Sequence, residues 1–310
     1  MAMLSVLTAT APIFLIIGLG YALFRSGLLP QEGVRAFGAF VLMVALPALI
    51  FKSLSQRAFV EILNPAFLAA FAAGTLGTAL VVFLAARYGL KRDLSGAAIM
   101  ALGAAGANSG FVGYPIAALV VGPPAVVALA LCMLVENLVT IPLLLAVAEA
   151  GRDPERGLRA AFATSLKALG QNPMILAIAA GALASVIGLR LPGALEKSVD
   201  MLAAASAPVA LVSIGGALAQ LRLSRRQDGI ALVVFGKLAL HPAAVFVALM
   251  LAPGLDSDLR RAMLIIAAAP MMTIYPLLGA RFGQASQTAA ALLVATILSF
   301  LTMSAVIALT

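Results

Sequence analysis

The 310-residue chain has one cysteine, one histidine and no tryptophan, and charged residues make up only 10% of it. The lone Cys132 lies within an apolar run, which excludes a disulfide framework and a cysteine-ligated metal site. Paired metal-binding carboxylates are also absent, so we predict neither a metal nor a cofactor. A soluble protein of this length would need far more polar surface. The scarcity of charge therefore indicates a membrane protein.

Apolar residues make up 63% of the chain, and they gather in ten segments. The segments are approximately 5–24, 34–51, 65–87, 94–121, 124–148, 172–189, 194–219, 229–252, 259–282 and 285–308. Each is long enough to cross a hydrocarbon core of ~30 Å. A helical apolar spacing over 158–169 further predicts a short helix lying on the membrane surface. We therefore predict an all-α polytopic membrane protein with ten transmembrane helices.

Lysine and arginine are unevenly distributed among the connectors. Connectors that follow odd-numbered segments hold 13 of these residues, whereas those that follow even-numbered segments hold six. Because cytoplasmic loops are enriched in lysine and arginine, we predict that the first set is cytoplasmic and that both termini are periplasmic. The net charge of +8 is then a topology signal of an inner (plasma) membrane protein. It does not indicate a nucleic-acid partner.

The two halves of the chain, 1–150 and 151–310, resemble each other. A shift of 161 residues places Pro12 on Pro173, Gly20 on Gly181, Gly27 on Gly188, Pro47 on Pro208, and Tyr114-Pro115 on Tyr275-Pro276. Five segments per half is an odd number, so the second half must cross the membrane in the opposite sense. The sequence thus predicts two inverted five-helix repeats in one membrane unit, an architecture of secondary carriers.

Residues 103–116 interrupt the fourth segment. Gly106, Gly110, Gly113 and Pro115 weaken helical hydrogen bonding there, and Pro270 and Tyr275-Pro276 occupy the matching part of segment 9. Two broken helices at the membrane centre indicate the binding site of a carrier. The alternative is a glycine-rich seam for helix packing. The matching breaks in both halves favour the binding site.

Half-helix ends at these breaks suggest how a ligand would be held. We expect amino ends near Tyr114–Ile116 and Pro276–Leu278 to favour an anion, and carboxyl ends near Gly106 and Ala269 to offer carbonyl groups. The predicted substrate site comprises Asn108, Ser109, Gly113, Tyr114, Pro115, Pro270, Met272, Thr273, Tyr275 and Pro276.

Four polar residues within other spans form a second predicted set, Glu136 and Asn137 in segment 5 and Lys237 and His241 in segment 8. Intramembrane ionisable groups are rare and usually functional. Glu136 is interpreted either as a proton-coupling group or partner of Lys237, or as a fixed structural contact. Both interpretations stay open. His241, which precedes Pro242, is better explained as a packing or hydrogen-bonding residue.

The motif Asn108-Ser-Gly-Phe-Val-Gly-Tyr-Pro-Ile resembles the fourth segment of the auxin efflux carrier family. Asn172-Pro173, Glu136-Asn137 with Ile141-Pro142, and the stretch from Ala269 to Gly283 are also similar to that family. The resemblance implies ten spans, crossing broken helices and transport of small organic anions, with Asn108, Gly113 and Pro115 at the crossover. In plant members a proline precedes the asparagine, where this chain has Ala107, which argues against auxin as substrate.

The leading hypothesis is therefore a secondary carrier of small carboxylates that works by alternating access, with protons as a candidate coupling ion. A sodium-coupled symporter of the bile-acid type is the alternative, since backbone carbonyls alone could bind sodium. An intramembrane hydrolase using Ser109 and His241 is disfavoured, because no nucleophile-elbow pattern flanks Ser109. The expected partners are an organic anion, membrane lipid and a coupling proton or sodium ion. A homodimer is compatible with the sequence.

Overall fold

A computed structural model describes residues 2–56, 64–153, 162–163, 168–220, 229–252 and 254–310. Within these ranges the regular secondary structure is helical, apart from one isolated bridge between Ala107 and Met271. Six continuous helical stretches are long and apolar enough to span a membrane: Glu32–Ser55, Pro65–Gly89, Pro124–Arg152, Gly193–Gln220, Ile230–Met250 and Ala285–Leu309. The predicted all-helical, polytopic membrane class is confirmed. Most of the surface helix predicted over 158–169 lies outside the described residues.

The helices of the first half are α1 (Ala2–Arg25), α2 (Glu32–Phe40), η1 (Val41–Ala45), α3 (Leu46–Ser55), α5 (Pro65–Leu84), η2 (Ala85–Gly89), α6 (Leu94–Ala105), η3 (Ser109–Gly113), α7 (Tyr114–Val121), α8 (Pro124–Val135), η4 (Glu136–Thr140) and α9 (Ile141–Arg152). Those of the second half are η6 (Ala168–Gln171), α11 (Pro173–Val186), α12 (Gly193–Gln220), α13 (Ile230–Phe235), η7 (Gly236–Leu240), α14 (His241–Met250), α15 (Ser257–Ala268), α16 (Tyr275–Ala280) and α17 (Ala285–Leu309).

Proline explains the widened turns η1, η3, η4 and η7. Each ends two residues before a proline, namely Pro47, Pro115, Pro142 and Pro242. Proline lacks an N–H group, and its ring clashes with the carbonyl four residues earlier. In each case the residue before the proline donates instead to the carbonyl five residues back, as Ile141 does to Glu136. The helix therefore continues through the proline as a π-turn, a form frequent at functional sites.

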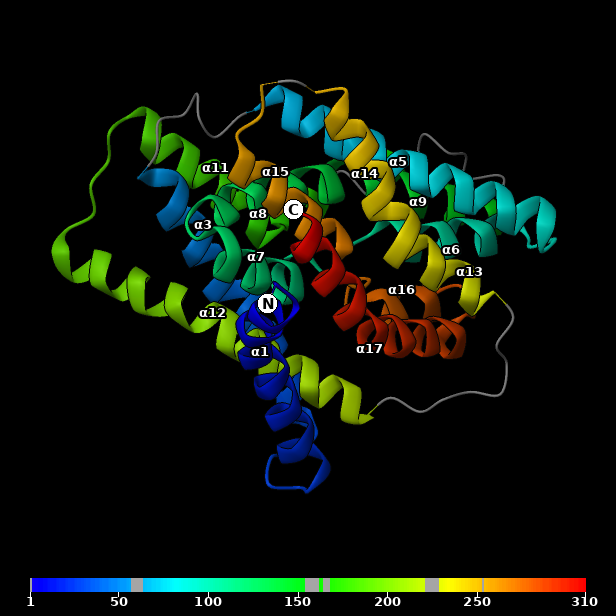
Figure 1. Ribbon diagram of the computed structural model, residues 1–310, viewed down its shortest axis with the longest axis horizontal. Coiled ribbons are helices and arrows are strands. Elements are labelled where there is room, and N and C mark those ends of the chain that lie inside the picture. The colour runs from blue at the N-terminus through cyan, green and yellow to red at the C-terminus, as the bar shows by residue number, and fades with distance from the viewer. Residues whose placement is uncertain (1, 57–63, 154–161, 164–167, 221–228, 253) are drawn as a thin grey trace.

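The helices form two groups by their contacts. In Figure 1, α3, α11 and α12 lie to the left and α5, α6 and α14 to the right, with α7, α8 and α15 between them. In the α12 group, α12 packs against α1, α2 and α3, and α11 packs against α3. In the α15 group, α5 packs against α6 and α14, α6 against α9, and α15 against α7, α8 and α17. The two groups also touch, because α3 contacts α8 and α12 contacts η3. The interrupted segment 4, which includes η3, therefore lies against the α12 group.

Two close helix contacts in the α12 group are alike. Gly20 of α1 lies against the backbone of Val212 in α12, and Gly181 of α11 lies against the backbone of Phe51 in α3. A Cβ atom added at Gly181 would lie 2.9 Å from Cβ of Leu54 and 3.2 Å from the carbonyl oxygen of Phe51, so a larger residue would push these helices apart. Gly20 and Gly181 are 161 residues apart, and so are Phe51 and Val212. The same helix-to-helix contact therefore occurs twice.

Candidate functional site

Two helices are interrupted where they meet. One stops at Ala105 and resumes at Ser109, and the other stops at Ala268 and resumes at Tyr275. Between these ends the chain leaves the helical path, and Ala107 pairs with Met271 in an antiparallel bridge. The backbone N–H of Asn108 donates to the carbonyl of Pro270 at 2.7 Å. Each break thus satisfies part of the backbone of the other, as buried irregular backbone in a membrane requires.

Asn108 links the breaks through its side chain as well. Its Nδ2 donates to Oγ1 of Thr273 at 2.9 Å. Its backbone carbonyl accepts from the N–H groups of Val112 and Gly113, so the residue also opens the η3 turn. Asn108 is buried whereas Thr273 is half-buried. The structure therefore brings together Asn108 and Thr273, two predicted substrate-site residues that are far apart in sequence.

Small residues let the interrupted helices approach closely. Gly103 lies directly under the ring of Tyr275, and Gly106 lies against the end of Met272. The hydroxyl of Tyr275 donates to the carbonyl of Ile99 at 3.1 Å, and Gly113 faces the backbone of Ile266. The predicted seam for helix packing thus exists alongside the breaks, and it accounts for Gly113 and Tyr275 through packing.

Glu136 stabilises the break in segment 4 through hydrogen bonds. Its Oε1 accepts hydrogen bonds from the backbone N–H of Ala107 at 3.1 Å and from Oγ of Ser109 at 2.8 Å, and Oε2 lies 2.9 Å from the same Oγ. The side chain is buried. Glu136 begins the π-turn η4, and its carboxylate lies at the start of the neighbouring half-helix, where a helix has partial positive charge.

Lys237 contacts the carboxyl end of α15, the half-helix that precedes the break in segment 9. Its Nζ lies 2.9 Å from the carbonyl oxygen of Ala267, at the last turn of α15, and 2.6 Å from Nδ1 of His241. His241 Nε2 lies 3.0 Å from Oγ1 of Thr75 on α5. Lys237 and Glu136 are near enough to interact electrostatically, but these two residues do not form a direct salt bridge.

Asn137 has a different setting from its neighbour. Its Nδ2 donates to the carbonyl of Met133, and its Oδ1 accepts from Nδ2 of Asn172 at 3.0 Å. Asn172 in turn caps α11 by accepting the N–H of Met174. This amide pair joins segment 5 to the α12 group.

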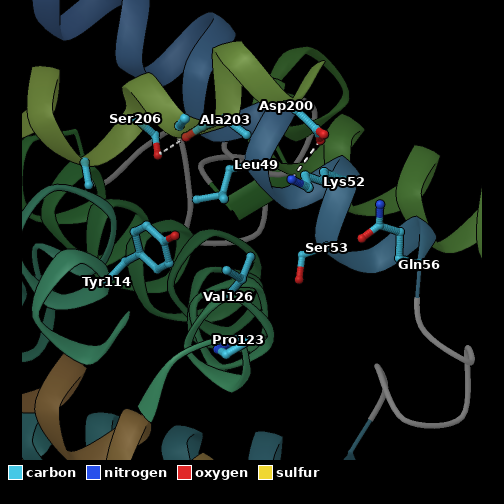
Figure 2. A pocket seen from close by; sticks show the side chains of 12 residues that line it. Leu49, Lys52, Ser53, Gln56, Tyr114, Pro123, Val126, Asp200, Ala203 and Ser206 are labelled. Carbon is cyan, nitrogen blue, oxygen red and sulfur yellow. Dashed lines mark hydrogen bonds and ion pairs between the residues drawn. The ribbon is translucent and has the colours of Figure 1, made fainter. Parts of the chain in front are cut away.

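Figure 2 shows a cavity of about 560 Å³ between α3, α12 and the turn that joins α7 to α8. Tyr114 lines it from α7, and Lys52 forms a salt bridge of 2.7 Å with Asp200 at its wall. A second cavity of about 520 Å³ shares Lys52, Gln56 and Asp200. Sequence analysis did not predict these cavities, because Lys52 was counted only as a connector charge and Asp200 was not singled out.

Two details differ from the sequence-based expectation. The second part of the broken segment 4 begins at Ser109, not near Tyr114, because Pro115 is accommodated by the π-turn η3. An acid, Glu136, occupies that amino end, and α16 has only six residues. The expected free amino end facing an anion is therefore wrong for segment 4, whereas α16 begins at Tyr275, next to the amino end expected near Pro276–Leu278. Ser109 and His241 also have separate partners and do not form a dyad.

The sequence is similar to those of known membrane transport proteins. The family described as "Membrane transport protein" matches residues 5–307. This chain belongs to that family, which includes the auxin efflux carriers. It is 32% identical over 300 residues to a Rhizobium meliloti (strain 1021) protein named "Putative malonate transporter", covering 94% of this chain and 92% of that one. It is 27% identical over 300 residues to the "Uncharacterized transporter YfdV" of Escherichia coli (strain K12), with 93% and 92% covered.

Membership identifies a multi-pass membrane transporter and not an enzyme. The intramembrane hydrolase considered from the sequence is thereby excluded. Among the described residues, no group of three or more histidine, cysteine, aspartate or glutamate side chains could hold a metal ion.

Proposed function

We propose that this transporter is a secondary carrier of small carboxylates, with the substrate bound where the two interrupted helices meet. The hydrogen bond from Asn108 to Thr273 is the observation on which this proposal rests. An amide and a hydroxyl meet there between two breaks in otherwise apolar helices. A carrier binding site at the membrane centre has this form.

An inverted repeat supports the proposal. In this reading, residues 1–150 and 151–310 each supply five spans, and the interrupted segments are the fourth and the ninth. The twin contacts of Gly20 with Val212 and of Gly181 with Phe51 agree with such a repeat. The two helix groups would then move against each other to open the site to either side, which is alternating access.

The anionic character of the substrate rests on chemistry and on a relative. Asn108 Nδ2 and Thr273 Oγ1 supply hydrogen-bond donors, and Lys52 lines the cavity that reaches Tyr114. The printed name of the Rhizobium meliloti protein is that of a malonate transporter. We therefore propose a small mono- or dicarboxylate such as malonate, malate or lactate as the substrate. Pro270, Met272 and Pro276 would shape its compartment.

Glu136 is proposed as the coupling group for protons. It is a buried acid that contacts the first break directly through Ala107 and Ser109. Adding or removing a proton on Glu136 would change which of these hydrogen bonds can form. Protonation would therefore alter the shape of the break that holds the substrate.

Competition between carboxylates tests the proposal. Purified protein in liposomes should take up labelled malonate, and unlabelled malonate, malate or lactate should reduce the uptake. The uncharged diamide of malonate is the matched control and should have no effect. Equal competition by the diamide, or competition by amines only, would contradict an anion site.

The proposed orientation has its own test. With Cys132 replaced by alanine, single cysteines introduced at the exposed Asp153 and at Thr310 should be labelled by an impermeant reagent from opposite sides of the membrane. We expect Thr310→Cys to react from the periplasm. Labelling of both positions from one side is incompatible with ten spans.

A further inference from the structure

The carboxyl end of α15 has an uncommon partner. The helix ends at Ala268, so the carbonyl of Ala267 is one of the last four, which have no N–H donor within the helix. Such carbonyls lie at the partially negative end of the helix. In carriers with broken helices, carbonyl ends of this kind coordinate the coupling cation.

In this protein a lysine fills that position. Nζ of Lys237 lies 2.9 Å from the Ala267 carbonyl oxygen and 2.6 Å from Nδ1 of His241. We assign the ring proton of His241 to Nε2, which lies 3.0 Å from Oγ1 of Thr75. Nδ1, which also lies 3.1 Å from the Ala267 carbonyl oxygen, then presents a lone pair to the ammonium group. Lys237 is therefore surrounded by a carbonyl oxygen and an imidazole nitrogen, both neutral ligands of a cation.

Lys237 is buried and has no direct acidic partner in the part of the chain that the structure describes. Lys237 is 0% exposed. Among the described residues, the salt bridges are Lys52–Asp200 and Glu149–Arg281, and neither includes Lys237. A buried charge without compensation is costly. The carboxyl end of α15, together with the more distant Glu136, supplies the negative potential that compensates it.

We propose that the ammonium group of Lys237 takes the place of a coupling cation at the carboxyl end of α15, so that this carrier works without sodium. Removing the side chain would then open a site for a small monovalent cation, lined by the Ala267 carbonyl and His241. This inference rests on the proposed carrier function, and it selects between the two coupling ions that the sequence left open.

Thermal unfolding of purified variants in detergent tests the proposal. Lys237→Ala should lower the unfolding temperature by several degrees in choline chloride, and sodium chloride at the same concentration should restore much of the loss. Lys237→Met leaves the carbonyl unpaired but fills the space, so sodium should not restore it. Lys197→Ala removes an exposed lysine of α12 and is the control. Its unfolding temperature should equal that of the unmodified protein in both choline chloride and sodium chloride.

The unmodified protein gives a second and independent result. Its unfolding temperature and its malonate uptake should be the same in sodium and in choline chloride. Sodium-dependent uptake or stabilisation of the unmodified protein would overturn the proposal, even if Lys237→Ala failed to fold. So would a Lys237→Ala protein that folds and responds equally to sodium and choline. Because the unfolding experiments contain no carboxylate, their failure is distinct from failure of the competition test.

Discussion

The two breaks that meet at the site are stabilised in opposite ways. The break in segment 4 has three residues, and an acid, Glu136, binds it from the side where the next half-helix begins. The break in segment 9 has six residues, and a base, Lys237, binds the end of the half-helix before it. Each charge thus faces the helix end of opposite partial charge. Two breaks of different length are therefore combined with opposite electrostatics.

The charges belong to one half each. A shift of 161 residues pairs Glu136 with Ile297 and Lys237 with Leu76, both apolar. The repeated features of the chain, such as Tyr114-Pro115 and Tyr275-Pro276, concern backbone shape. The functions that need charge, such as coupling, must therefore depend on residues that are not repeated.

Among the predicted changes, replacing Glu136 should have the largest effect on folding and uptake. Glu136→Ala leaves the N–H of Ala107 and the hydroxyl of Ser109 without their acceptor, at about 1–3 kcal/mol for each buried group. We expect little folded protein. Glu136→Gln keeps an acceptor oxygen but cannot titrate, so it should fold and exchange bound substrate while its uptake no longer varies with pH. Uptake and exchange in proteoliposomes across a pH series measure both.

Glu149→Gln is the matched control for that experiment. Glu149 pairs with the exposed Arg281 at 3.1 Å, away from the breaks, and an exposed pair of this kind contributes little. Its pH profile should be that of the unmodified protein. An unchanged pH profile in Glu136→Gln would return Glu136 to a purely structural role.

The sequence predicted the helical ends at the breaks well where glycine and proline determine the backbone. Gly106 and Ala269 were expected to follow the first half-helices, and α6 and α15 do end at Ala105 and Ala268. Pro115 misled the prediction, because a proline in a helix can be accommodated by a wider turn as well as by a break. Which outcome occurs depends on neighbours that a single sequence does not reveal.

Side-chain partners were the least predictable part. Glu136 and Lys237 were recognised as unusual because ionisable residues are rare in membrane spans. Their partners include backbone groups, the N–H of Ala107 and the carbonyl of Ala267. Nearly every residue has these groups, so the sequence does not indicate which of them will be a partner. Thr75, which contacts His241, was missed because threonine is ordinary in an apolar helix, and α5 also contains Thr78.

The smallest expected effect concerns the bond that joins the two breaks. Asn108→Ala should leave the protein folded and weaken carboxylate binding roughly tenfold to a hundredfold, since a hydrogen bond to a charged group is worth about 1.5–3 kcal/mol. Thr273→Val removes only the neutral partner of Asn108, worth about 0.5–1.5 kcal/mol, so its effect should be smaller. If the two residues act on the substrate through their shared bond, the double variant should bind more tightly than the summed single effects imply. Calorimetric titration with malonate measures all three variants. Normal binding by Asn108→Ala would mean that this amide only joins the two helices.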